Sequence, residues 1–296
     1  MKFTIGSDPE LFLVDKDKNF VNAYNYLGGQ VKGTKEKPEA TEYGAIQVDG
    51  MAIELNTKPT IDREEFSDML EDGLTDVKKR FPDLDISTEC VQKFSKEFLK
   101  NQPSESVILG CDPDYSAYRL QQNQAPNPEH LFRTAGGHIH IGWTEGVSVD
   151  SHQHLEMCAK AVKQLEVLIS YWSTAVEPPN DRTNLYGNYG CFRPKHYGVE
   201  YRTPSNFWLF NPDYRQEIFD RCAVGMQLLA DGKELFNSAS LNNVSVWRQL
   251  APNSKLLQEP ETISDSHYRH YKNYLVPLIE ANETYIQERS KLHAAS

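Results

Sequence analysis

The sequence predicts an α+β protein with a mostly antiparallel sheet and helices packed on one face of that sheet. Short runs with apolar residues at alternate positions, typical of strands, are mixed with long stretches of helical apolar spacing. The two kinds of segment do not alternate regularly, as they would in a parallel sheet built from βαβ units. We therefore expect strands that pair mainly with antiparallel neighbours.

Seven short runs have strand character because β-branched and aromatic residues recur in them between polar or glycine-containing breaks. The sixth run is flanked by glycine. The runs are residues 2–6, 10–15, 45–56, 85–91, 106–110, 136–143 and 198–203.

Three helices are expected from apolar residues repeated at helical spacing. The first follows Asp62, which forms a capping box with Glu65, and its apolar residues are Phe66, Leu70, Leu74, Val77 and Phe81. The second begins near Asp150 or Ser151 and carries Leu155, Cys158, Val162, Leu165, Ile169 and Trp172. The third begins near Pro212 and carries Ile218, Cys222, Met226 and Leu229.

A fourth helix is expected in the tyrosine-rich stretch from Asp265 to Leu292, with a kink at Pro277. The chain has 296 residues and no internal repeat, so we expect one domain over residues 1–296. Its motifs lie in residues 1–210, and residues 211–296 form a helical C-terminal part.

Composition limits the class of protein and its partners. The net charge of −11 opposes binding to the phosphate backbone, so bulk nucleic-acid binding is not expected. No apolar run is long enough to span a bilayer, and the N-terminus turns acidic too early for a signal peptide. We therefore expect an intracellular, cytoplasmic protein without membrane contact. The five scattered cysteines indicate reduced, structural thiols.

Four of the expected strands carry polar side chains on one face only. Because side chains alternate along a strand, residues two apart share a face. The paired residues are Asp8 with Glu10, Glu54 with Asn56, His138 with His140, and Glu200 with Arg202. If these strands are neighbours, the sheet has a concave face lined with ligand atoms. Crowded carboxylates repel each other unless cations lie among them, and oxygen ligands favour Mg²⁺, with Mn²⁺ possible beside histidine.

Each motif also has an ordinary structural interpretation. A histidine on a strand is often a packing residue with satisfied hydrogen bonds. The Asp-Pro-Glu run is compatible with a surface turn, Glu54 with a solvated strand position, and Glu200 with a surface ion pair to Arg202. The functional interpretation rests on the joint occurrence of the four motifs with the same alternation.

Arginines are concentrated in a glycine-rich and aromatic-rich segment from Asp181 to Trp208. Arg182, Arg193 and Arg202 there are suited to holding phosphate or carboxylate groups, although aromatic stacking is an alternative role. The chain contains neither a P-loop motif nor a dinucleotide-binding glycine motif.

Together these motifs resemble the glutamine synthetase-like carboxylate–amine ligases, and most closely the type 2 amidoligases common in tailed phages and bacteria. The matching pieces are GSDPELFL, VDGMAIELNTKP, GCDPDYSAY, GGHIHIG and YGNYGCFRPKHYGVEYRTPSNFW, from Gly6 to about Leu209. The resemblance implies a glutamine synthetase-like catalytic fold, with a curved sheet and helices on its outer face.

The resemblance also implies roles for individual residues. The metal ligands would be Asp8, Glu10, Glu54, His138 and Glu200. Asp49 is the candidate for a second acid beside Glu54, but its spacing to Glu54 is short for that role. His140 would support the reaction. Arg193 and Arg202 would act in catalysis and, with Arg182, in binding the nucleotide. Asp112 and Asp114 would shape the substrate side.

The implied reaction is ATP-dependent amide bond formation between a small-molecule or peptide carboxylate and an amine, through an acyl phosphate and with Mg²⁺ or Mn²⁺. A monomer or homodimer would suffice because all motifs lie in one chain, and phage origin would place the protein in the host cytoplasm. The alternatives are a phosphotransferase related to guanidino kinases, a metal-dependent hydrolase, and a non-catalytic interaction protein on the same fold. For the hydrolase, further ligands would have to come from His152, His154 or His196, of which the first two are expected in the solvated first turn of a helix.

Overall fold

The structure is a computed structural model that describes residues 2–108, 114–125, 127, 129–177, 180–183 and 187–236. The expected fourth helix at Asp265–Leu292 and most of the C-terminal part lie outside the described residues, as does Cys111.

The main sheet has nine strands in the order β10-β9-β13-β14-β12-β1-β6-β5-β4, and each neighbouring pair is antiparallel. Two smaller sheets pair β11 with β8, and β3 with β2 and β7. The strands are β1 Thr4–Leu11, β2 Leu13–Val14, β3 Phe20–Val21, β4 Glu39–Ala40, β5 Gly44–Asp49, β6 Ala52–Thr57, β7 Asp85–Ile86, β8 Val91–Lys93, β9 Tyr115–Ser116, β10 Gln121–Gln122, β11 Phe132–Thr134, β12 Gly137–Gly142, β13 Cys191–Lys195 and β14 Gly198–Tyr201.

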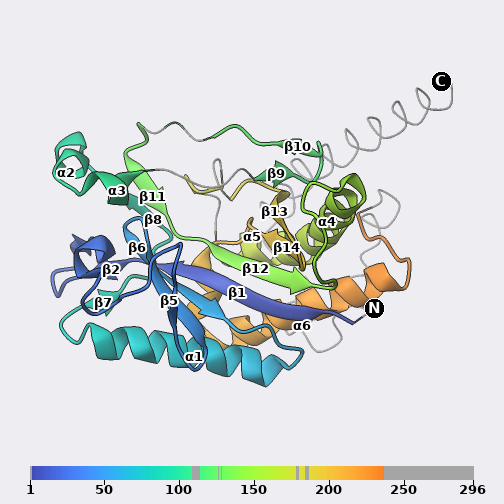
Figure 1. Cartoon of the computed structure of the whole chain (residues 1–296), viewed down its shortest axis with the longest axis horizontal. Coiled ribbons are helices and arrows are strands. Elements are labelled where there is room, and N and C mark those ends of the chain that lie inside the picture. Colours follow the sequence, from blue (N-terminus) through green and yellow to red (C-terminus); the bar gives the residue numbers. More distant parts are fainter. Residues whose placement is uncertain are drawn as a thin grey trace.

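Helices cover the apolar face of the main sheet. Figure 1 shows α1 and α6 on one side of β1 and β12, with α2, α3, β8 and β11 on the other side. The helical segments are η1 Ala23–Tyr26, α1 Arg63–Arg80, α2 Lys96–Lys100, α3 Ser104–Val107, α4 His152–Leu165, the π-helix η2 Glu166–Ser170, α5 Tyr171–Val176, η3 Asn206–Phe210 and α6 Pro212–Ala230. These layers confirm the α+β class and the mostly antiparallel sheet.

The three expected helices within the described residues are confirmed, although the second is divided into α4 and α5 by the π-helix η2, and the start of α1 differs from a full capping box. Asp62 caps α1 by accepting a hydrogen bond from the backbone N–H of Glu65 at 2.8 Å. The Glu65 carboxylate does not return to the N–H of Asp62, as a full capping box would require. It accepts instead from the Thr60 hydroxyl, and the N–H of Asp62 donates to that hydroxyl oxygen at 3.0 Å.

The predicted runs contain β5, β6, β12 and β14 and the two ends of β1, but the run 45–56 is a hairpin of two strands, and β4, β9, β10 and β13 were not predicted. Residues 106–110 were expected in a strand, but Ser106 and Val107 end the short helix α3. The backbone N–H of Ser106 and its hydroxyl both donate to the carbonyl of Pro103, which closes a helical turn. In the run 10–15 the chain leaves the main sheet after Leu11, and Leu13 pairs with β3 and β7 instead.

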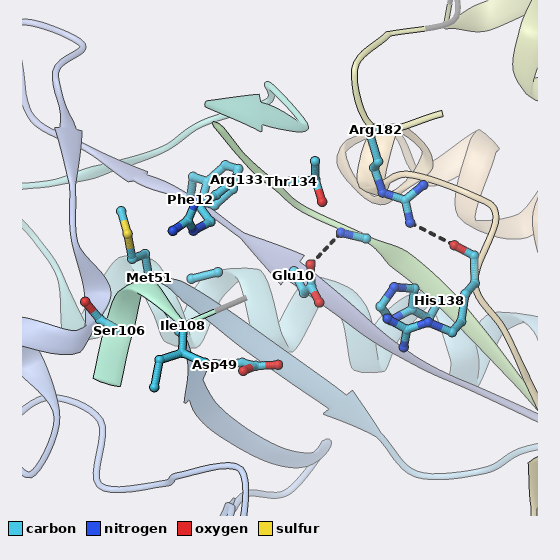
Figure 2. Close-up of a pocket in the computed structure, with 14 residues that line it drawn as sticks. Glu10, Phe12, Asp49, Met51, Ser106, Ile108, Arg133, Thr134, His138 and Arg182 are labelled. Carbon is cyan, nitrogen blue, oxygen red and sulfur yellow. Dashed lines mark hydrogen bonds between the residues drawn. The ribbon is translucent and has the colours of Figure 1, made fainter. Parts of the chain in front are cut away.

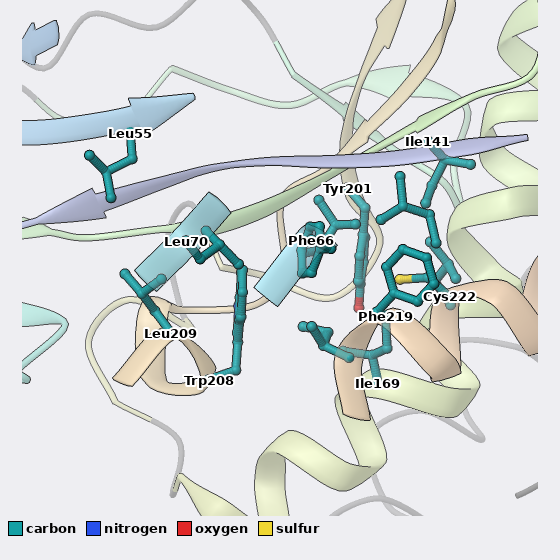
Figure 3. Packing of buried hydrophobic residues seen from close by; sticks show 14 of the residues in the cluster. Leu55, Phe66, Leu70, Ile141, Ile169, Tyr201, Trp208, Leu209, Phe219 and Cys222 are labelled. Carbon is teal, nitrogen blue, oxygen red and sulfur yellow. The ribbon is translucent and has the colours of Figure 1, made fainter. Parts of the chain in front are cut away.

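The core lies between the apolar sheet face and α1, α4 and α6 (Figure 3). Ile5, Ile139 and Ile141, on the face opposite to the acids, are fully buried there. Phe66 of α1 and Trp208 of η3 are also fully buried, and their rings stack with centroids 6.1 Å apart. The buried thiols of Cys158 and Cys222 fill helix faces, as the sequence predicts.

Replacement of Phe66 by alanine is expected to lower the free energy of unfolding by about 3–5 kcal/mol, because it leaves a cavity against Trp208 and Phe219. Equilibrium denaturation in urea measures this. Ile61→Ala, just before the same helix and 79% exposed, is the matched control and should change stability by less than about 0.5 kcal/mol. Equal effects for the two variants would contradict the described packing.

Candidate functional site

The four strands with polar faces are direct neighbours, in the order β14-β12-β1-β6. Their register places the polar residues opposite one another. Asp8 lies opposite His138, Glu10 opposite Glu54, and Glu200 opposite His140. Residues that face each other across antiparallel strands point to the same side of the sheet. One sheet face therefore collects the acids and histidines, as the sequence predicts, and the apolar face collects the core.

The first group of ligand atoms comes from Asp8, His140 and Glu200, which each offer one atom within 4.8 Å of the others. His140 Nε2 lies 2.9 Å from Asp8 Oδ2, and His138 Nδ1 lies 3.3 Å from Asp8 Oδ1. Burial opposes ionisation of Asp8, but the charge of His140 and the hydrogen bonds from His138 and His140 together outweigh burial and hold the pKa of Asp8 below its usual range. Both histidines therefore contact Asp8, whereas the sequence analysis expected His138 to be a metal ligand and His140 to support the reaction.

Tyr197 was not singled out by the sequence motifs, yet it orients His140. Its hydroxyl forms a hydrogen bond with Nδ1 of His140, which leaves Nε2 toward Asp8. Tyr197 reaches this position because the β13–β14 hairpin turns at His196 and Tyr197. A hydrogen-bond partner on one imidazole nitrogen fixes the tautomer and the direction of the other nitrogen, as residues hydrogen-bonded to metal ligands do.

The second group of ligand atoms comes from Glu10, Asp49 and Glu54, again within 4.8 Å of one another. Asp49 lies close to Glu54 because β5 and β6 form a tight hairpin with a two-residue loop. Gln47 lies opposite Glu54 and Asp49 opposite Ala52, so Asp49 is the diagonal neighbour of Glu54 on the same face. Gly50 starts the loop with φ +57°. An Asp-Gly pair is typical of a tight hairpin turn. Because the chain reverses there, Asp49 and Glu54 lie close together although they are near each other in the sequence.

In the second group Glu54 is buried and Glu10 and Asp49 are partly buried, and the three carboxylates repel one another. Burial, followed by repulsion from Asp49, raises the pKa of Glu10 to about 7. Burial and the neighbouring acids Asp8, Asp49 and Glu10 raise the pKa of Glu54 well above its ordinary value. Burial also raises the pKa of Asp49. Three converging carboxylates with raised pKa values fit a hard divalent cation, which would favour their charged forms.

Glu200 lies among cationic side chains rather than in an isolated position. Its carboxylate is fully buried and contacts Arg202, Arg193 at 3.1 Å and Lys195 at 2.7 Å. Burial opposes its ionisation, but Arg202, Arg193 and Lys195 outweigh burial and hold the pKa of Glu200 well below its usual range. Three cationic side chains thus converge on one buried carboxylate in an otherwise acidic chain. Lys195 was missed from the sequence, although it shares a face with Arg193 two residues before it.

Arg182 is placed differently from Arg193 and Arg202. It is 1% exposed and donates to the backbone carbonyls of Arg202 at 2.8 Å and Thr203 at 2.6 Å, so it supports the end of β14. It lies on the wall of the cavity in Figure 2 rather than beside Glu200. Asp114 Oδ2 lies 3.8 Å from Arg202 Nε, and Asp112 lies outside the described residues.

Among the residues that the structure describes, His152, His154 and His196 belong to neither of the two ligand groups. His152 is exposed at the start of α4, as expected, and contacts Glu156. The expectation for His154 is wrong. It is buried, and its Nε2 lies 2.8 Å from the carbonyl oxygen of Lys195. It is buried because the first turn of α4 packs beside β13.

Part of this sheet lies in a segment that matches a known family model. Residues 125–244 match the family model described as phage phiEco32-like COOH.NH2 ligase-type 2. This segment, which is less than half of the chain, is similar to a carboxylate–amine ligase family. The match confirms the resemblance inferred from the motifs, and the ligase segment contains β12, β13 and β14 with their histidines, arginines and Glu200. No curated protein matches the chain.

The strands β1, β5 and β6, which supply the remaining acids, lie outside the ligase segment but pair with it through β12. The family suggests a ligase that joins a carboxylate to an amine. None of the described helices combines the length and the apolar character that a membrane crossing requires.

Proposed function

We propose that the protein is an ATP-dependent carboxylate–amine ligase that works through an acyl phosphate on a glutamine synthetase-like sheet. The observation that carries this proposal is the presence of two ligand groups on successive same-face positions of β1, beside a cluster of arginine and lysine. Such an arrangement suits a polyphosphate held between cations on one side and arginines on the other.

Two divalent cations, Mg²⁺ or Mn²⁺, would be held by the two groups. Asp8, His140 and Glu200 would hold one, and Glu10, Asp49 and Glu54 the other. Asp8 and Glu10, which belong to different groups, are two residues apart on the same face of β1. When bound, the cations would neutralise phosphate charge.

The roles of the two histidines are reversed relative to the sequence-based expectation. We assign the ligand role to His140 because its Nε2 atom belongs to the first group. His138 would orient Asp8 as a neutral ring, since burial, followed by the charge of Arg202, lowers its pKa to about 4.

Arg193, Lys195 and Arg202 would bind the phosphates of ATP. In the chain alone they surround Glu200. An anionic phosphate would compete with Glu200 for these side chains and free its carboxylate for a cation. Arg202 would contact the transferred phosphoryl group, where guanidinium N–H groups pair with phosphate oxygens.

The proposed reaction has two steps. An oxygen of the substrate carboxylate attacks the γ-phosphorus of ATP, the bond to the bridging oxygen breaks, and ADP leaves. The amine nitrogen then attacks the acyl carbon, phosphate leaves with the oxygen it received, and the nitrogen loses a proton. The protein supplies positioning and charge neutralisation, which is consistent with a site built from acids and arginines. One chain holds all these residues, so a monomer or homodimer would suffice.

Calorimetry with a non-hydrolysable ATP analogue and Mg²⁺ tests the nucleotide site. We expect binding to the wild-type protein, with at least about tenfold weaker binding for Arg193→Gln because a charge-assisted contact is lost. Arg119→Gln removes an exposed arginine in the turn between β9 and β10 and should bind like the wild type. Absence of binding to a folded wild type would overturn the proposal.

Trapping with hydroxylamine tests the acyl phosphate. Hydroxylamine is a general amine nucleophile, so a panel of carboxylates with ATP and Mg²⁺ should give hydroxamates together with ADP and phosphate. With an ¹⁸O-labelled carboxylate, one label should appear in the released phosphate. ATP hydrolysis without label transfer would indicate a different reaction.

Metal binding should depend on pH in a defined direction. A cation requires deprotonated carboxylates, and the pKa of Glu10 is raised to about 7, with those of Asp49 and Glu54 also raised. The apparent affinity for Mn²⁺ is therefore expected to rise between about pH 5 and pH 8. Titration followed by electron paramagnetic resonance measures free Mn²⁺ directly. An affinity that is constant over this range would argue against binding at the second group.

A further inference from the structure

A buried carboxylate lies under the apolar face of β14. Glu166 is the first residue of the π-helix η2 and is fully buried. The next three residues, Val167, Leu168 and Ile169, are buried and apolar and belong to the main core. A carboxylate in such surroundings lowers stability unless its oxygens accept hydrogen bonds. Single π-helical turns within α-helices often occur at functional sites.

The carboxylate of Glu166 is held by neutral hydrogen-bond donors. Its Oε2 atom accepts from the hydroxyl of Ser170 at 2.6 Å. Its Oε1 atom accepts from the backbone N–H of Gly190 at 2.8 Å and from the hydroxyl of Thr203 at 2.5 Å. Burial raises the pKa of Glu166, and these hydrogen bonds oppose that rise. One oxygen atom thus joins the residue before β13 to the segment that follows β14.

This junction lies next to Arg202. The two residues that Oε1 holds flank a backbone pair, in which the N–H of Arg202 donates to the carbonyl of Cys191 at 3.0 Å. The carbonyl of Arg202 accepts from Arg182 at 2.8 Å. The guanidinium of Arg202 contacts Glu200 on the polar face of the sheet. Glu166 therefore lies behind the backbone from which that guanidinium projects.

Strand alternation separates the two faces at this point. Tyr201 and Thr203 are two residues apart and share the face toward η2, whereas Arg202 between them points to the polar face. The hydroxyl of Tyr201 lies 2.9 Å from that of Ser170, and its ring lies in the core near Ile169 (Figure 3). Contacts on the core face therefore act on Arg202 through its backbone.

We propose that Glu166 is a positioning residue for Arg202. Its hydrogen bonds to Gly190 and Thr203 fix the backbone on both sides of the pair formed by Cys191 and Arg202, and so fix the direction of the guanidinium. A side chain that binds a transferred group needs such support from the residues behind it. The link to phosphate rests on the proposed ligase function, whereas the effect on Arg202 itself does not.

Three variants separate positioning from general stability. Glu166→Met keeps a long side chain but leaves the N–H of Gly190 and the hydroxyl of Thr203 without their acceptor. Glu166→Gln keeps an oxygen in the place of Oε1, and its amide can donate to the hydroxyl of Ser170. Leu168→Ala lowers stability in the same π-helix without removing these hydrogen bonds. Should Glu166→Met not fold, Thr203→Val takes its place, because it removes one of the two bonds and keeps the side-chain shape.

Hydrogen exchange at the Nε–H of Arg202, followed by ¹⁵N NMR without any ligand, measures the effect directly. We expect exchange about tenfold faster in Glu166→Met, and within about twofold of the wild type in Glu166→Gln and Leu168→Ala. The Nε–H of Arg215, which donates to Ser67 at 3.2 Å, is the internal control and should not change. Unchanged exchange at Arg202 in Glu166→Met would overturn the proposal, as would equal acceleration in Leu168→Ala.

Calorimetry with the Mg²⁺ complex of the ATP analogue measures the consequence for binding. We expect about tenfold weaker binding in Glu166→Met, because a misdirected guanidinium loses its charge-assisted contact. Glu166→Gln should restore the affinity to within about twofold of the wild type, and Leu168→Ala should not change it. A role through hydrogen bonds would be excluded if Glu166→Gln bound as weakly as Glu166→Met.

The two measurements also separate this proposal from the proposed function. Faster exchange at Arg202 in Glu166→Met, without nucleotide binding to the wild type, would overturn the ligase proposal and leave the positioning of Arg202. Nucleotide binding that is equally tight in the wild type and in Glu166→Met would overturn only the role of Glu166.

Discussion

Glu200→Gln is expected to lower the free energy of unfolding by about 3–5 kcal/mol. The variant keeps the shape of the side chain but removes the negative charge that Arg193, Lys195 and Arg202 share. Most of the loss comes from Arg202, which is 4% exposed and would keep an incompletely balanced charge. Lys195, with 27% of its side chain exposed, contributes less because water screens it.

Urea denaturation of Glu71→Gln is the matched control for this experiment. Glu71 also pairs with a buried arginine, Arg215 at 2.8 Å, but its own side chain is 56% exposed. Its replacement should lower the free energy of unfolding by less than about 1 kcal/mol. Equal effects for the two variants would contradict the buried ion cluster around Glu200.

The effect of Glu200→Gln should also depend on pH. Because the folded state lowers the pKa of Glu200 well below that of the unfolded chain, its ionised form contributes stability above about pH 4.5. That contribution is lost as the pH falls below this value. The stability difference between wild type and variant should therefore be constant near neutral pH and shrink in acid.

Glu54→Gln is expected to have opposite effects on the metal-free protein and on metal binding. Without a cation, the variant removes a buried charge that Asp8, Asp49 and Glu10 repel, while the new amide oxygen can still accept from Gln47. We expect the free energy of unfolding of the metal-free variant to be about 1–2 kcal/mol higher than that of the wild type near pH 8. The folded state raises the pKa of Glu54, so this gain should grow as the pH rises above about 4.5.

With Mn²⁺ or Mg²⁺, the same variant should lose roughly 100-fold in affinity at the second group, because one of three carboxylate ligands is gone. Thermal unfolding with and without the cation measures both effects in one experiment. Glu42→Gln, an exposed glutamate in the turn before β5, should behave like the wild type. The described group of Glu10, Asp49 and Glu54 would be contradicted if Glu54→Gln were less stable than the wild type without metal and were stabilised by metal as much as the wild type.

Much of the site could be predicted because strand alternation is a local property. Asp8 with Glu10, and His138 with His140, share a face whatever their neighbours are. Their joint presence, with Glu54, Glu200 and the arginines, led to the resemblance that the match over residues 125–244 confirms. The apolar residues between them, such as Ile139, likewise identify the core face.

Two site residues were discounted or missed because their positions depend on hairpins. Asp49 joins Glu54 through the tight β5–β6 turn, and Tyr197 reaches His140 through the β13–β14 turn. The Asp-Gly pair indicates the first hairpin, but the register that makes Asp49 a diagonal neighbour depends on the loop length. No comparable sequence signal precedes Tyr197.

The sequence by itself determined the α+β class, the faces of the strands and the helices within the described residues, since hydrophobic periodicity and helix capping act over a few residues. Only the tertiary structure decided which strands are neighbours and which charges meet. Pairing between β1 and β12 joins residues about 130 positions apart and puts Asp8 beside both histidines. Tertiary contacts also decided that Arg182 supports the backbone after β14, whereas the side chains of Arg193 and Arg202 contact Glu200. Contacts of this range depend on burial and register across the whole sheet, which no local pattern contains.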